Sequence, residues 1–229
     1  MAAIPLQRDI DYPESDGRPL GESDLHRDEI VDLVFALRQR YREVPDVYVA
    51  GDLFLYYTRG DRQAVVCPDV FLVRGVPKGP RRTYKLWEEG KGPSLVIEVT
   101  SASSRDEDLE EKPGKYARLG VEEYFLFDPL DEYLSPRLQG FRLAGGRYLP
   151  IEPETPAADI ALISRTTGLR LRVEGERLRL VDLATGRPLP RTEEEPLARE
   201  AAEARAAAAE ARADALAAEL ERLRRLTSR

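Results

Sequence analysis

Two acidic side chains lie within otherwise apolar, strand-like runs near the middle of the chain. Asp69 belongs to the run CPDVFLV, residues 67–73, and Glu98 belongs to SLVIEVTS, residues 94–101. An ionised carboxylate in such a setting costs several kcal/mol unless another group pairs with it. The sequence therefore raises the question of which group pairs with these two acids.

One chemical answer is a divalent cation held between the two carboxylates. Mg²⁺ prefers oxygen ligands, usually takes one or two carboxylates, and completes its shell with water and phosphate oxygens. Such a cation offsets the charge that develops when water attacks a phosphodiester, and it lowers the pKa of a bound water. A nearby lysine ammonium can orient that water or stabilise the transition state. Two acids and a lysine therefore suit phosphodiester hydrolysis.

Each acid also has a simpler structural explanation. Most aspartates that follow a proline, as Asp69 follows Pro68, accept backbone hydrogen bonds at a turn or strand end. An arginine could neutralise Glu98 without any catalysis. Cys67, beside the first acid, is expected to be a small buried hydrophobe. The metal-site hypothesis therefore depends on both acids and a lysine acting together.

The surrounding segments predict a mixed α/β domain. A helix is expected from its N-cap Ser23 to about Tyr41, because apolar residues recur there near helical spacing. β-Rich runs follow at 47–51, 53–58, 64–75, 94–101 and 123–129. The run that contains Glu98 is otherwise apolar at nearly every position, which is typical of a strand buried on both faces. Alternating residues separated by glycine turns predict hairpins up to about residue 190.

A second helix is expected after the strand that carries Glu98. Ser104 and Glu107 have the spacing of a capping box, which predicts a helix start near Arg105. Pro113 interrupts the same segment, and proline inside a helix removes a hydrogen bond and clashes with the preceding turn. We therefore expect a kink or break at residues 112–114.

The order of these motifs resembles a known superfamily. PDV at 68–70 followed by IEVTS at 97–101 resembles the PD-(D/E)xK superfamily of restriction endonucleases. The longer pattern, continuing through LGVEEYFLFDP at 119–129, resembles its Uma-two family over roughly residues 20–185. The resemblance implies a restriction-endonuclease-like mixed β-sheet flanked by helices, with extra β-hairpins and a C-terminal helical extension. It also implies a Mg²⁺- or Mn²⁺-dependent endonuclease.

The resemblance assigns roles to individual residues. It implies Asp69 and Glu98 as metal ligands, with the Val99 backbone carbonyl as a third. The lysine that usually stands two residues after the glutamate is absent, because Thr100 occupies that position. The resemblance suggests instead a migrated lysine, Lys112, in the pattern Asp108-x-x-x-Lys112-x-x-x-Tyr116 on the following helix. Lys115 is the alternative if the kink displaces Lys112.

Two further groups of residues could join such a site. Six basic side chains in the glycine- and proline-rich segment 74–93 could hold phosphates at its mouth, or could simply be solvated. In this superfamily an acid of the first helix sometimes joins the site, here Glu22 or Glu29. Surface or capping roles are favoured for these two acids and for His26, which lies four residues after Glu22.

Composition excludes several other classes of protein. The 229 residues include one cysteine and one histidine, so an intrachain disulfide and a zinc site built on several such ligands are excluded. No apolar run reaches the roughly 18 residues that a membrane helix needs, and the first residues do not resemble a secretory signal. A cytoplasmic protein is expected. The net charge of −7 argues against a broad nucleic-acid-binding surface, which would normally be basic.

The last segment of the chain differs from the rest. We expect a nuclease-like domain at 1–190 and a C-terminal helix at 191–229, because residues from Pro196 onward are strong helix formers. Its apolar residues form a heptad seam that predicts a weak coiled coil. The expected partners are nucleic acid, with DNA favoured over RNA, and a second copy of the chain in a homodimer. The alternative function is a catalytically weak or inactive nuclease-fold adaptor acting through this helix.

Overall fold

The computed structural model describes residues 12–15, 23–154, 160–194 and 212. Contacts divide the chain into one unit of residues 1–189 and another of 190–229. The predicted C-terminal helix and its heptad seam lie almost entirely outside the described residues and stay predictions. Within the described ranges, no helix combines the length and apolar composition that crossing a bilayer requires.

The first unit has a mixed α/β fold, as expected. Its helices are α1 (Asp24–Arg40), α2 (Leu86–Glu89), the π-helical turn η1 (Glu107–Glu111) and α3 (Lys112–Leu119). Its strands are β1 (Val47–Ala50), β2 (Leu55–Tyr56), β3 (Val65–Val66), β4 (Val70–Arg74), β5 (Tyr84–Lys85), β6 (Leu95–Val99), β7 (Glu123–Phe127), β8 (Leu138–Ala144), β9 (Arg147–Pro150), β10 (Ala161–Ser164), β11 (Leu169–Glu174) and β12 (Arg177–Asp182).

The main sheet has the strand order β1-β4-β6-β7-β8-β9 among the described residues. β6 and β7 are parallel, and the π turn with α3 forms the crossover between them. The other neighbours in this sheet are antiparallel. Strands β10–β12 form a second sheet, and β3-β2-β5 form a third, small one. The run 64–75 is therefore two strands, β3 and β4, separated by the segment that contains Asp69.

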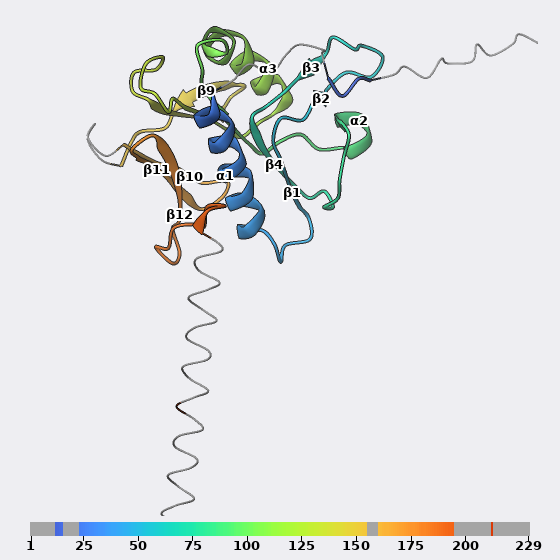
Figure 1. Cartoon of the computed structure of the whole chain (residues 1–229). Helices are drawn as coiled ribbons and strands as arrows, with labels where there is room; N and C mark the ends of the chain where they lie inside the picture. Colours follow the sequence, from blue (N-terminus) through green and yellow to red (C-terminus); the bar gives the residue numbers. More distant parts are fainter. Residues whose placement is uncertain (1–11, 16–22, 155–159, 195–211, 213–229) are drawn as a thin grey trace, which may run out of the picture. The chain divides into compact units, whose positions relative to one another are not determined.

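The main sheet is covered on both faces. Alternate residues of each strand point to opposite faces, and they enter two different apolar clusters. One cluster joins Leu95, Ile97 and Val99 of β6 to α1 and the β10–β12 sheet. The other joins Val96 of β6 to Tyr116 of α3 and to the small sheet. Figure 1 shows α1 in blue between the orange β10–β12 sheet and strands β1 and β4, which it contacts on either side.

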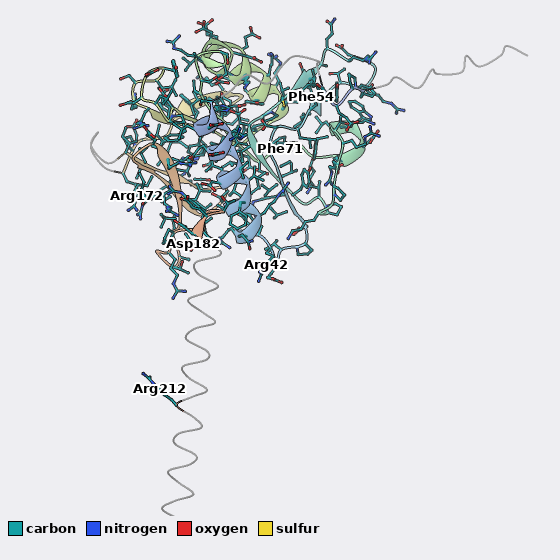
Figure 2. The ribbon with its side chains drawn as sticks, viewed as in Figure 1. Arg42, Phe54, Phe71, Arg172, Asp182 and Arg212 are labelled. Carbon is teal, nitrogen blue, oxygen red and sulfur yellow. The ribbon has the colours of Figure 1, made fainter. Side chains whose placement is uncertain are left out.

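The helix α1 begins and ends close to the predicted residues. Ser23 is its N-cap, and the Ser23 hydroxyl accepts a hydrogen bond from the backbone N–H of His26. Basic Arg38 and Arg40 in the last turn favour the helix C-terminus through its dipole. Figure 2 labels Phe71 of β4 within the body of this unit and the exposed Arg42 and Arg172 at its surface.

Candidate active site

Asp69 and Glu98 come together where β4 begins and β6 ends. The antiparallel register pairs Val70 with Ile97, so the next pair outward is Asp69 with Glu98. The Asp69 backbone N–H donates to Glu98 Oε2 at 3.2 Å, and the Val99 backbone N–H donates to Asp69 Oδ2 at 2.7 Å. The side chains of both acids therefore hydrogen-bond to the opposite strand.

A close approach of the chain keeps Asp69 in place. A Cβ atom on Gly51 would lie 2.5 Å from the backbone oxygen of Asp69 and 2.8 Å from Val34 of α1. The next residue, Asp52, donates its backbone N–H to the Pro68 oxygen at 3.2 Å. Only glycine allows the segment after β1 to pack this closely against the start of β4.

Glu98 faces the side of the sheet that α3 covers. Because Val96 and Glu98 are two residues apart on β6, both point to that face. The Tyr116 hydroxyl donates to Glu98 Oε1 at 2.5 Å, and Lys112 Nζ lies 3.0 Å from Glu98 Oε2. Glu98 is fully buried, and the exposed fraction of Lys112 is only 6%. The lysine named by the sequence pattern therefore lies in contact with Glu98.

The expected break at Pro113 does not occur. The chain is helical from Arg105 to Leu119, with a π-helical turn at Glu107–Glu111. The backbone N–H of Lys112 bonds to the oxygen of Glu107, five residues back. α3 then starts at Lys112 with Pro113 in its first turn, where a missing N–H is tolerated. The π turn therefore accommodates the proline and leaves Lys112 pointing at Glu98.

Lys115 does not reach Asp69 and Glu98. It pairs instead with Glu111 at 3.1 Å and with Glu107 at 3.8 Å on the outer side of the helix.

The capping box expected at Ser104 and Glu107 is wrong. The Ser104 hydroxyl instead donates to Asp108 Oδ2 at 2.8 Å. The serine thus stabilises a buried carboxylate rather than the free N–H groups of the helix.

Asp108 is a third acid beside Lys112; the pattern Asp108-x-x-x-Lys112-x-x-x-Tyr116 includes it, but the resemblance assigned it no role in the site. It is fully buried, and its Oδ1 lies 2.7 Å from Lys112 Nζ. Its spacing four residues before Lys112 in that pattern places both side chains on one helix face. The ammonium group of Lys112 therefore contacts both Asp108 and Glu98.

His26 is buried, and the surface or capping role favoured for it is wrong. Its exposed fraction is 3%. Its Nε2 lies 2.5 Å from the Val99 backbone oxygen and 3.7 Å from Asp69 Oδ2. A ring N–H at Nε2 would donate to the Val99 carbonyl, the oxygen that the family resemblance names as a third ligand. A surface role is wrong for Glu29 too, since its exposed fraction is 1% and it accepts from the Leu178 backbone N–H at 2.9 Å, in a different region. Glu22 lies outside the described residues.

The cluster of acids is short of positive charge. Burial raises the pKa of Glu98 well above its ordinary value; Lys112 opposes this shift, while Asp69 and Asp108 add to it. Burial also raises the pKa of Asp108, again against the effect of Lys112. Burial alone would lower the pKa of Lys112, but the three acids together raise it well above its usual range. The surrounding acids therefore favour the charged form of Lys112, whereas Glu98 and Asp108 keep their protons to a higher pH than free carboxyl groups do.

The donor atoms fit a hard divalent cation in kind and in charge. Asp69, Glu98 and Asp108 carry three negative charges when ionised, and Lys112 supplies one positive charge, which leaves an excess of two. Within the described ranges, no three His, Cys, Asp or Glu side chains form a ready-made ligand set. Mg²⁺ does not need one, because it is usually bound by one or two carboxylates and keeps several waters. The exposed fraction of the Asp69 side chain, 14%, leaves it accessible from solvent.

The basic segment 74–93 is not a single loop, since it contains β5 and α2. Several of its cations bind protein groups. Lys78 Nζ donates to the backbone oxygens of Tyr41 and Arg42 at 2.6 and 2.7 Å. These oxygens follow the C-terminal end of α1, whereas His26 lies near its N-terminal end. Lys78 therefore caps the helix away from the acids.

Among the comparisons with known proteins, the match to a family model agrees with the sequence resemblance. A comparison with curated proteins finds no match. A similar solved structure is the crystal structure of a "putative nuclease belonging to DUF820" from Anabaena variabilis, with 14% sequence identity and a TM-score of 0.46 over 64% of this chain and 75% of that chain. The model of the Uma2 family, described as "Putative restriction endonuclease", matches residues 2–174. Because this match spans well over half of the sequence, the chain belongs to the Uma2 family.

Proposed function

We propose that this protein is a divalent-metal-dependent endonuclease that hydrolyses phosphodiester bonds in DNA. The observation that carries the proposal is the meeting of Asp69, Glu98 and Lys112 where β4 begins and β6 ends, in the middle of the main sheet. Membership of a family whose description is "Putative restriction endonuclease" supports the same reaction class. Two carboxylates and an ammonium in contact are the groups that this chemistry requires.

Each residue has a definite task in the proposed reaction. Asp69 and Glu98 would hold the cation, with the Val99 carbonyl as a further oxygen donor, because a carbonyl retains a second lone pair beside the one that His26 engages. A bound Mg²⁺ or Mn²⁺ would supply positive charge beside the scissile phosphate and acidify a water molecule there. Lys112 would orient the attacking water and offset negative charge as it develops on phosphate oxygens.

The alternative is a nuclease-fold adaptor with a weak or inactive site. The displaced lysine and Pro113 favoured it, but Lys112 contacts Glu98 despite the proline. The helix through which such an adaptor would act lies outside the described residues. Calorimetry with Mn²⁺ separates the two functions, since an adaptor with a decayed site has no binding for Glu98→Gln to remove.

The decisive test is the nicking of supercoiled plasmid DNA with Mg²⁺ or Mn²⁺, followed as conversion to open circles. We expect the wild type to nick, EDTA to stop it, and Asp69→Asn, Glu98→Gln and Lys112→Met each to lower the rate by about 100-fold or more. Lys115→Met is the matched control, because its ammonium pairs with exposed acids and should be dispensable.

Equal activity of the wild type and Asp69→Asn would overturn the proposal and would indicate a contaminating nuclease. Parallel assays on single-stranded DNA and on RNA test the substrate. Cleavage of RNA alone would contradict DNA as the substrate but would leave the phosphodiester chemistry in place.

A further inference from the structure

Asp108 is buried and makes hydrogen bonds through both carboxylate oxygens and its backbone oxygen. Its Oδ2 accepts from the Ser104 hydroxyl at 2.8 Å, and its Oδ1 binds Lys112 Nζ at 2.7 Å. Its backbone oxygen accepts from the buried Tyr124 hydroxyl at 2.9 Å. The carboxylate is therefore fixed through both of its oxygens and through its own backbone.

Lys112 needs a partner other than Glu98 if Glu98 binds a cation. The ammonium lies 3.0 Å from Glu98 Oε2, one of the oxygens that the proposed function gives to the metal. A cation there would compete for that oxygen and would repel the ammonium as a like charge. A lysine side chain has four flexible carbons and many rotamers, so an ammonium without a partner would not stay in one position.

The contact with Asp108 does not depend on Glu98. Asp108 and Lys112 are four residues apart on one helical segment, and that spacing brings their side chains together whatever binds to the sheet. The π-helical turn lies in the same segment, and π-helical turns are frequent at functional sites. The helix therefore carries both the ammonium and the group that holds it.

Strand β6 and the residue after it carry no lysine that could replace Lys112. Thr100 occupies the position two residues after Glu98. Its exposed fraction is 2%, and its Oγ1 has no hydrogen-bond partner in the described part of the chain. A threonine hydroxyl supplies no positive charge, so the ammonium must come from the helix, and its position must be set there.

We propose that Asp108 is the positioning residue that keeps the Lys112 ammonium at the site when a divalent cation occupies Asp69 and Glu98. The inference rests on the proposed function and deepens it. Asp108 acts through Lys112 and touches neither the metal nor the substrate. Its loss should therefore slow the reaction without weakening binding of the metal.

The kinetic test compares Asp108→Ala and Asp108→Asn with the wild type under Mn²⁺. Because small misplacements of a reacting group can cost about 100-fold, we expect kcat of Asp108→Ala to fall by about that factor. Both KM and the Mn²⁺ dissociation constant from calorimetry should stay within about threefold. Asp108→Asn keeps an oxygen that can accept from Lys112 and should lose less. Asp106→Asn, a change at an exposed acid two residues away, is the control and should match the wild type.

A second measurement follows the ammonium itself and does not need activity. The chain has only five lysines, and Lys112 is the buried one. Selective ¹⁵N-lysine labelling should therefore show one ammonium signal protected from exchange, absent in Lys112→Met. We expect this signal to persist in the wild type on addition of Mg²⁺ and to be lost in Asp108→Ala on the same addition.

The possible outcomes separate the two proposals. If the wild type cleaves with metal but Asp108→Ala keeps its kcat, or keeps the protected signal under Mg²⁺, the role of Asp108 is refuted and the nuclease function stands. A large loss of Mn²⁺ affinity in Asp108→Ala would also refute it, by making Asp108 a ligand. If Asp108→Ala does not fold, the same criteria apply to Asp108→Asn. Failure of the wild type to cleave refutes the proposed function instead.

Discussion

Two buried glutamates lie on neighbouring strands of the main sheet, Glu98 near the end of β6 and Glu123 at the start of β7. The parallel register pairs Glu123 with Leu95 and Glu98 with Leu126, so the two acids lie at opposite ends of the strand pair. Alternation also sends their side chains to opposite faces of the sheet. Both have exposed fractions of 1% or less, yet their surroundings differ.

Glu123 is surrounded by donors. Its Oε1 accepts from Arg142 Nε and Nη2 at 3.0 and 2.8 Å and from the Arg165 backbone N–H at 3.0 Å. Its Oε2 accepts from the Ser164 hydroxyl at 2.6 Å and the Thr166 backbone N–H at 3.2 Å. A guanidinium and three further donors compensate one carboxylate. This arrangement fastens β7 to the segment after β10 and leaves no unbalanced charge.

Glu98 shares one ammonium with two other acids. Asp69 and Asp108 both raise the pKa of Glu98, in addition to the effect of burial. The comparison shows that burial alone does not identify a functional carboxylate. Under the proposed function, an excess of negative charge in a place that solvent can reach through Asp69 is the feature that separates a cation site from a structural ion pair.

The largest expected effect comes from breaking the ion pair between Arg142 and Glu123. Arg142→Met leaves the Glu123 carboxylate buried without its counter-charge, and we expect a loss of about 3 kcal/mol of unfolding free energy, the low end for breaking a buried ion pair. Urea denaturation at neutral pH measures it. Arg172→Met is the control, because Arg172 is exposed and pairs with Glu174 at the surface, where such pairs contribute about 0–1 kcal/mol. Equal losses would contradict the structural role of Glu123.

Metal binding at Glu98 should have a smaller effect on the free energy of unfolding. At a Mn²⁺ concentration of 100 times Kd, the unfolding free energy of the wild type should rise by about 2.7 kcal/mol. Glu98→Gln should abolish this stabilisation, because it removes a proposed ligand. Arg142→Met should retain it despite its lower stability, since Arg142 lies at the opposite end of the strands. Stabilisation that persists in Glu98→Gln would show that the ion binds elsewhere.

Over a single pH unit, the smallest effect is the pH dependence of stability without metal. The pKa of Glu98 is raised well above its ordinary value of 4.5, so above that pH the native state holds this proton more tightly than the unfolded state. The contribution of Glu98 to stability is therefore greatest below pH 4.5 and declines as pH rises through the native pKa, by at most about 1.4 kcal/mol per pH unit. We expect wild type in EDTA to lose stability relative to Glu98→Gln over this range. A difference independent of pH would refute the shift.

The sequence by itself determined most of the elements and the meeting of the two acids. Hydrophobic period and the cap at Ser23 located α1, and continuous apolar runs located β4, β6 and β7. These signals are local, so they can be recognised without knowing the fold. Two acids that interrupt apolar runs were also a local signal, because each demanded a partner. The heptad seam of the tail and the homodimer stay predictions.

Only the tertiary structure decided which groups complete the site. Pro113 predicted a break, but the π turn absorbed it and left Lys112 at Glu98. His26 had the pattern of a surface residue, yet α1 packs so that its ring meets the Val99 carbonyl, 73 residues away in the chain. Folding also buries Asp108 and brings its backbone oxygen to the Tyr124 hydroxyl, 16 residues away in the chain. A buried polar group is stabilised by partners distant in sequence, and local patterns carry no information about which partners folding will bring to it.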